Sequence, residues 1–250
     1  MREHLHAEWT KLRTLPGTGW LLLTIVALTV AVGVAASAVV SCCDYDPARI
    51  GLFGVQVSQA VVAVLAVLTV TGEYGTGMIT LTLTAMPRRT GVLAAKAIVL
   101  AGLTLVAGSV AVLASALVTR PVLVGNGFPA ETLDLTGGPV LRAAVGSVLY
   151  LVLIALFSLG VATAVRDSAT AIGVVLGLLY LFPSLILMVS DADWQRFLWR
   201  ISPMNAGLAV QATTNLGSLP LGPWTGLGVL GAWTVAALLG GGLLLRTRDA

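Results

Sequence analysis

Six long apolar runs constrain this chain more than any other feature of its sequence. They lie approximately at residues 20–40, 51–71, 92–118, 141–165, 169–189 and 224–245. A helix that crosses the roughly 30 Å hydrocarbon core of a bilayer needs about 20 mostly apolar residues. Only 10% of the residues are charged, which is too few to cover a water-facing surface. The sequence therefore predicts an all-α integral membrane protein with six transmembrane helices, in which residues 1–250 form a single transmembrane domain.

The distribution of Lys and Arg residues predicts how the spans are oriented, because positively charged loops tend to stay in the cytoplasm. With the N-terminus inside, nine of the 14 Lys and Arg residues fall on cytoplasmic segments. The five outside are Arg49, Arg120, Arg142, Arg196 and Arg200. We therefore expect a multi-pass protein of the cell (plasma) membrane with both termini in the cytoplasm. The net charge of +3 follows from this topology, so nucleic acid is not expected as a partner.

Residues 1–17 are polar but periodic. Trp9 and two leucines recur at helical spacing, while charged side chains occupy the other faces. This pattern predicts an interfacial helix that lies in the headgroup plane before the chain turns into the bilayer. His4 and His6 would point to different faces of such a helix, and no zinc-type spacing occurs, so no metal site is expected.

The motifs of catalysis do not occur in this sequence. It has no G-x-x-x-x-G-K-[ST] phosphate-binding loop, so the chain is not expected to bind ATP itself. Both histidines lie near the N-terminus without a nucleophile pattern beside them, which argues against serine hydrolysis. No carboxylate lies in the core of a span, which argues against a proton relay. We expect neither enzyme activity nor a cofactor on this chain. Cys42 and Cys43 are adjacent and would rarely pair with each other; they are free thiols or small apolar residues, or they pair between molecules.

Uncharged polar side chains inside the spans are the candidates for a substrate path. Gln56 and Gln59 lie three residues apart on the second span and therefore share a helix face. Tyr150 on the fourth span and Tyr180 on the fifth add hydroxyl groups. Amides and hydroxyls in lipid need partners, so these residues either line a path or hydrogen-bond neighbouring helices.

The fifth span carries two further features that bear on its packing and shape. Gly173 and Gly177 form a G-x-x-x-G pair, which permits another backbone to approach closely. Pro183 is expected to kink the helix near its outer third.

A polar, glycine-punctuated segment, EYGTGMITLTLTAMPRRTGVLAAK, separates the second and third spans at residues 73–96. Glu73 supplies a carboxylate at the membrane interface, and Pro87 ends the alternating part. Threonines there alternate with apolar residues, including Ile79, Leu81 and Leu83. An unpaired strand edge at a membrane surface is unfavourable. The segment therefore forms either a short amphipathic helix or a simple polar loop.

The same segment resembles the signature that follows the second span of bacterial type-2 ABC-transporter permeases, including actinobacterial-like exporters. The pattern is E-x-x-x-G, followed ten residues later by P-R-R and, nine residues beyond the proline, by a lysine. The matching residues are Glu73, Gly77, Pro87, Arg88, Arg89 and Lys96. Met78 and Gly75 depart from the residues common in that family. The six spans, the interfacial N-terminal helix and the long segment before the last span extend the resemblance over the whole chain.

In such permeases this segment is the coupling helix, which sits in a cleft of a separate ATPase subunit. The resemblance therefore implies an exporter subunit that couples ATP hydrolysis by an ABC ATPase partner to substrate efflux. It also implies that ATP and Mg²⁺ are bound by that partner, and that a second permease copy or a paralogue completes the dimer. The expected coupling residues are Glu73, Gly77, Ile79, Leu81, Leu83, Pro87, Arg88, Arg89 and Lys96. The alternative is a non-transporting membrane anchor or immunity subunit that recruits a partner protein.

Residues 190–223 form the longest connection, before the last span. Trp194, Phe197 and Ile201 recur at helical spacing, which predicts a helix on the outer leaflet that breaks over residues 201–206. The resemblance implies a pair of short external or re-entrant helices near the substrate exit. The alternative is an ordinary external loop.

Overall fold

The chain is an all-α protein with six helical segments long and apolar enough to cross a membrane. The computed structural model describes residues 7–11, 14, 16–41, 45–75, 89–130, 134 and 137–247. No β-strand occurs within these ranges. The candidate spans are Gly17–Val39, Pro47–Gly75, Gly91–Gly125, Gly138–Val165, Ser168–Ile186 and Pro223–Leu245. Each overlaps one of the six apolar runs, so the prediction of six apolar, span-length helices is confirmed.

Several of the spans are built from more than one helical element. The first, third, fourth and sixth spans are α2 (Pro16–Val39), α6 (Arg89–Gly125), α7 (Gly138–Val165) and α12 (Pro223–Thr247). The second comprises α3 (Pro47–Gly51) and α4 (Gly54–Gly75). The fifth comprises α8 (Ser168–Leu176), the π-helix η2 (Gly177–Leu181) and α9 (Phe182–Ile186). Between the fifth and sixth spans lie α10 (Ala192–Ile201), α11 (Pro203–Leu208) and the 3₁₀ turns η3 (Ala209–Gln211) and η4 (Leu216–Ser218).

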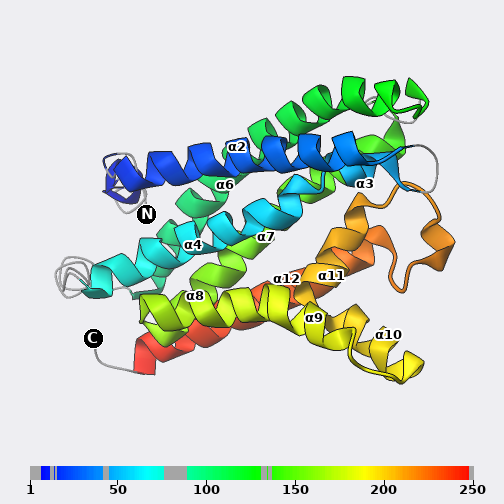
Figure 1. Ribbon diagram of the computed structural model, residues 1–250. Coiled ribbons are helices and arrows are strands. Elements are labelled where there is room, and N and C mark those ends of the chain that lie inside the picture. Colours follow the sequence, from blue (N-terminus) through cyan, green and yellow to red (C-terminus); the bar gives the residue numbers. More distant parts are fainter. Residues whose placement is uncertain are drawn as a thin grey trace.

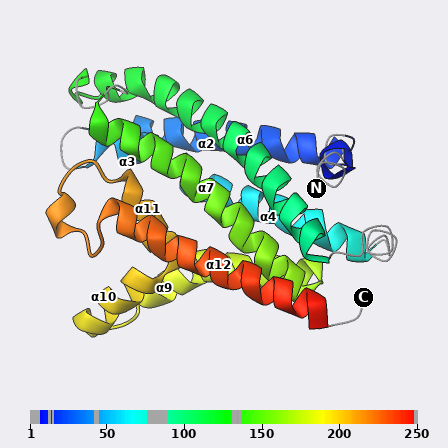
Figure 2. The same cartoon turned by 180° about the vertical axis from the view of Figure 1, so that it is seen from behind.

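Two helices form the centre of the bundle, and the others surround them (Figures 1 and 2). The spans of α4 and α7 are 61% and 56% buried, whereas the other four are 22–33% buried. α7 packs against α4, α6 and α12, while α2 packs against α4 and α6. The outer helices direct large apolar side chains away from the bundle, as Leu105, Val110 and Leu117 do on α6. Such a surface suits lipid as its solvent.

A glycine allows the central helix α7 to approach the neighbouring helix α12 closely. A Cβ atom built on Gly160 of α7 would lie 2.5 Å from the carbonyl carbon of Ala237 in α12, so only glycine fits at this crossing. The G-x-x-x-G pair of the fifth span behaves differently. Apart from the helix's own backbone, no atom of the described residues lies within 4 Å of a Cβ built on Gly173 or Gly177, so this pair makes no close helix contact in the part of the chain that the structure describes.

The fifth span is shaped by a π turn that precedes Pro183. The amide of Phe182 donates to the carbonyl of Gly177, five residues earlier, and Pro183 then follows near the start of α9. Proline has no amide hydrogen to continue the α-helical ladder, and a π turn shifts the hydrogen-bond register ahead of it. The kink expected at Pro183 stays a prediction, and the structure shows a π turn directly before this residue.

The two ends of the bundle are formed by different segments of the chain. At one end, called here the charged end, lie residues 7–11, which are helical, together with the end of α4, the start of α6 and the end of α12 (Figure 1). At the opposite end lie α3, α10 and α11.

At the opposite end, α10 is followed directly by a second helix. The predicted break over residues 201–206 is wrong in its extent, because α10 ends at Ile201 and α11 begins at Pro203. Ser202 alone interrupts the helices, and its hydroxyl accepts from the amide of Asn205 at 3.5 Å as the cap of α11. Ser202-Pro203 combines a preferred N-cap residue with proline at the first helical position, so it restarts a helix as readily as it ends one.

Candidate functional site

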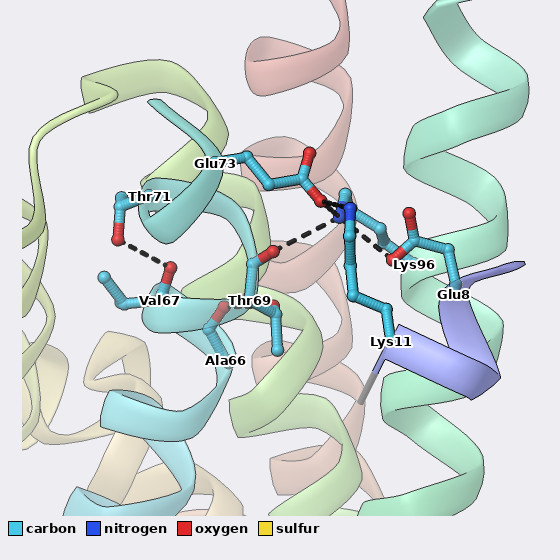
Figure 3. A network of polar contacts seen from close by, with 8 residues as sticks. All are labelled: Glu8, Lys11, Ala66, Val67, Thr69, Thr71, Glu73 and Lys96. Atoms are coloured by element: carbon cyan, nitrogen blue, oxygen red, sulfur yellow. Dashed lines mark hydrogen bonds and ion pairs between the residues drawn. The ribbon is translucent and has the colours of Figure 1, made fainter. Parts of the chain in front are cut away.

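A cluster of four charged side chains lies at the charged end and joins three segments of the chain. This charge cluster consists of Glu8, Lys11, Glu73 and Lys96 (Figure 3). Both lysines donate to the same oxygen, Oε1 of Glu73, each with Nζ at 2.5 Å. Lys96 Nζ also lies 3.0 Å from Oε2 of Glu8. The helical residues 7–11, the last turn of α4 and the start of α6 are thereby held together.

Lys96 belongs to the buried face of α6. Val92, Ala95, Val99 and Leu100 are buried with it, at the spacing of one helix stripe. Its side chain is 5% exposed, and those of Glu8 and Glu73 are 6% and 7% exposed. An unpaired charge at such a position would be very costly. The ammonium group is paired instead, with two carboxylates and with the carbonyl of Thr69, which accepts at 3.2 Å.

The cluster contains two carboxylates and two ammonium groups, so its formal charges balance. Lys11 is its most accessible member, with 30% of the side chain exposed. Oε2 of Glu73 is buried, and no donor among the described residues reaches it. Buried ion pairs contribute little net stability, because desolvation offsets their attraction, but removing one partner is strongly destabilising. The arrangement therefore fixes the positions of three segments relative to one another.

A second set of polar contacts connects the end of α4 to other helices at the charged end. Arg166 adopts a left-handed backbone conformation at the end of α7, with φ of 67°. Its guanidinium group lies 5.4 Å from the centre of the Tyr74 ring and donates to the carbonyl of Leu244 at 3.4 Å. The hydroxyl of Ser168 donates to that of Thr71 at 2.8 Å. The end of α4 is thus tied to α7, α8 and α12 as well as to the charge cluster.

Asp167 caps α8 in the same turn. Its carboxylate accepts from the hydroxyl and the amide of Thr170, each at 2.7 Å. These two hydrogen bonds, the hydroxyl first, hold the pKa of the exposed Asp167 below its ordinary value. The cap carboxylate therefore stays ionised at neutral pH, which favours the N-terminus of α8.

Of the nine expected coupling residues, Glu73 and Lys96 are brought into direct contact. Arg89 is the first residue of α6. The remaining six, namely Gly77, Ile79, Leu81, Leu83, Pro87 and Arg88, lie outside the described residues. Glu8 and Lys11 were not expected from the sequence as partners of Glu73 and Lys96. Their spacing of three places both on one helix face, which was the available signal, but nothing in it indicated which span that face would meet.

The four candidate path residues separate into two pairs. Gln59 and Tyr150 are fully buried; the hydroxyl of Tyr150 donates to Oε1 of Gln59, whose amide nitrogen lies 3.3 Å from the sulfur of Met204. Gln56 and Tyr180 instead line a cavity of about 310 Å³ at the opposite end. The hydroxyl of Tyr180 donates to the backbone carbonyl of Gln56 at 2.7 Å. Gln56 and Tyr180 are therefore accessible to a ligand in this arrangement, and Gln59 and Tyr150 are packed.

No group of three or more His, Cys, Asp or Glu side chains within the described ranges is arranged to hold a metal ion. Comparison of the chain with protein-family models and with curated proteins finds no match. The case for a function therefore depends on the geometry of the charge cluster and of the cavities.

Proposed function

We propose that this protein is the membrane subunit of an ABC exporter, which couples ATP hydrolysis by a separate ATPase subunit to substrate efflux. It would act in the plasma membrane with both termini in the cytoplasm, paired with a second copy or a paralogue. On this proposal the charged end faces the cytoplasm, and residues 76–88 form the element that contacts the ATPase.

The observation that carries the proposal is the shared contact of Lys11 and Lys96 with one oxygen of Glu73. Glu73 lies in the last turn of α4 and Lys96 lies near the start of α6, so the two residues bracket the connection assigned to the ATPase. Because these groups are buried and mutually paired, a displacement of that connection would move α4, α6 and the N-terminal helix together. The charge cluster would in this way convert a displacement of residues 76–88 by the ATPase into a movement of the helix bundle.

Two amphipathic elements fit the same topology. Trp9 is half-exposed on the N-terminal helix, as expected of an anchor in the cytoplasmic headgroup region. Helix α10 has no buried residue and exposes Trp194 and Phe197, whose rings make an edge-to-face contact. On our proposal α10 lies on the outer leaflet, with these two rings in the interface.

Co-purification tests the proposed partner. The tagged chain, extracted from its native membranes in a mild detergent, should bring with it a protein that hydrolyses ATP. A chain lacking residues 80–86 should insert normally into the membrane but lose that ATPase activity from the eluate. Undiminished ATPase capture by the deleted chain, at equal expression, would refute the assignment of this segment.

Thiol accessibility separates a transporter from a non-transporting anchor. The label site is Gln56→Cys in a Cys42→Ser/Cys43→Ser background. The control is Asp193→Cys, because the side chain of Asp193 is 90% exposed. For the complex with its ATPase, alternating access predicts that ATP changes the labelling rate at position 56 by severalfold and leaves the control rate unchanged. An anchor would capture the ATPase and show no ATP-dependent change at position 56.

A further inference from the structure

A cavity of about 430 Å³ lies at the opposite end of the bundle, bordered by α3, the start of α4, η3 and residues 214–219. This volume is within the range of sites that hold small organic ligands, which is about 300–1,000 Å³. Most of its lining residues have no role in the proposed coupling, and the charge cluster lies at the other end of the molecule.

The two charged residues that border this cavity have different surroundings. The carboxylate of Asp46 is occupied by the chain itself: it accepts from the amide of Thr213 at 2.5 Å, from the hydroxyl of Thr213 at 2.7 Å and from the amide of Thr214 at 3.0 Å. Arg49 uses only its backbone amide, which donates to Asp46 at 3.3 Å. Its guanidinium group has no partner among the described residues, and Arg49 is one of the residues that line the cavity.

The remaining lining combines an amide with an apolar wall. Gln56 borders this cavity and also the second cavity of about 310 Å³ that contains Tyr180. Ile50, Phe53, Leu208 and Leu219 supply apolar surface around the polar groups. The guanidinium group of Arg49 can donate two hydrogen bonds to one anion, and the amide of Gln56 lies in the same cavity lining. Together with the apolar wall, these groups suit a ligand that carries one anionic headgroup on an apolar body.

We propose that this cavity binds an amphiphile with a single carboxylate or phosphate headgroup, which Arg49 pairs with while Ile50, Phe53 and Leu219 cover the apolar part. Binding at this site stands independently of transport. The further statement that such amphiphiles are the exported substrate class rests on the proposed function.

Equilibrium binding of radiolabelled laurate tests the site. The full chain is placed in phosphatidylcholine nanodiscs, and binding to empty nanodiscs is subtracted. Arg49→Gln should weaken laurate binding at least tenfold, which is the order expected for loss of a charge-assisted hydrogen bond. Arg49→Lys should retain part of the affinity. Arg200→Gln, which removes an exposed arginine of α10 outside the cavity lining, should leave it unchanged. Dodecanol, which has the same chain without the charge, should bind weakly to every variant.

Equal laurate affinity of the wild type and Arg49→Gln would overturn the proposal, and so would an equal loss with Arg200→Gln. Thermal unfolding of each variant shows whether the fold is retained. Phosphatidylglycerol added to the nanodiscs identifies the source of the headgroup. If phosphatidylglycerol competes with laurate in the wild type but not in Arg49→Gln, the ligand is a bilayer lipid. If laurate binds the wild type without such competition, the ligand is a free amphiphile. The laurate experiment contains no ATPase, so it is independent of the co-purification experiment. If the wild-type chain captures an ATPase but does not bind laurate, the proposed site alone is overturned. If it binds laurate but captures no ATPase, the proposed function alone is overturned.

Discussion

Replacing Lys96 with methionine should destabilise the protein more than any other single change in the charge cluster. The substitution keeps the length and apolar stem of the side chain but removes the cation that lies 2.5 Å from Glu73 and 3.0 Å from Glu8. Glu8 then has no cation within the described residues, whereas Glu73 keeps Lys11. One buried carboxylate, Glu8, would be left unpaired, and the other, Glu73, would keep only the partly exposed ammonium group of Lys11.

The size of the effect follows from the burial of the cluster. Breaking a buried ion pair by removing one partner costs about 3–5 kcal/mol. For a chain of 150–250 residues, each kcal/mol lowers Tm by about 2–4 °C, so Lys96→Met should lower Tm by roughly 6–20 °C. The triple variant Glu8→Gln/Glu73→Gln/Lys96→Met removes the uncompensated charges as well, and Lys11 can turn towards water. Its stability should return to within about 1 kcal/mol of the wild type.

Thermal unfolding in a mild detergent, followed by tryptophan fluorescence, measures these differences. Arg196→Met is the matched control, because Arg196 pairs with Asp193 at 3.5 Å across an exposed surface. Such a pair contributes about 0–1 kcal/mol. Should Lys96→Met cost no more than Arg196→Met, or should the triple variant be as unstable as the single one, the reasoning about buried charge would be refuted.

Three further predictions use the same unfolding assay. Gly160→Val should lower the free energy of unfolding by about 1–3 kcal/mol or more, because the new side chain meets the α12 backbone at Ala237. Gly173→Ala should be neutral or stabilise by up to about 1 kcal/mol, because no neighbouring segment among the described residues lies within 4 Å of the added Cβ. Equal losses at both sites would contradict the assigned packing. Tyr150→Phe should cost about 1–3 kcal/mol because Oε1 of the buried Gln59 loses its donor, and Tyr150→Phe/Gln59→Leu should recover part of that loss if the hydrogen bond is responsible. The pKa of Asp167 is lowered in the folded protein, so the stability that this cap contributes is complete above the ordinary carboxyl pKa of about 4 and is lost as the pH falls through the lower folded pKa. The stability difference between wild type and Asp167→Ala should therefore shrink below about pH 4. A difference that does not change with pH would contradict this prediction.

The six spans could be predicted from the sequence because one physical requirement, about 20 apolar residues per crossing, is local and strong. The packing of the spans could not, because lipid solvation selects apolar residues on every face and so erases the contrast between inside and outside. Gly160 and Gly173 illustrate the difficulty. Both are glycines in apolar helices, yet only Gly160 meets a neighbouring backbone. Which glycine is used depends on a helix far along the chain.

The candidate site was predictable in the same partial way. Glu73 and Lys96 were expected to belong to one site because both match the signature of the polar segment between the second and third spans, and the structure brings them together. Glu8 and Lys11 resembled ordinary solvated charges of an interfacial helix, since nothing local distinguishes a lysine that faces water from one that faces a buried glutamate. The exposed Arg49 was assigned only to an outer loop, because the cavity beside it is closed by residues more than 150 positions later.

The charge cluster also sets an order of events during synthesis. Glu8 contacts a lysine that lies 88 residues later in the chain. At about 5–20 residues per second, the ribosome needs roughly 4–18 s to reach it. Throughout that interval the third span offers no cation to Glu8, so this ion pair cannot form while only the first two spans have been made. Only the arrival of Lys96 supplies the ammonium group that contacts Glu8 and Glu73 together, so the contact that joins the three segments is completed after the start of α6 has been made.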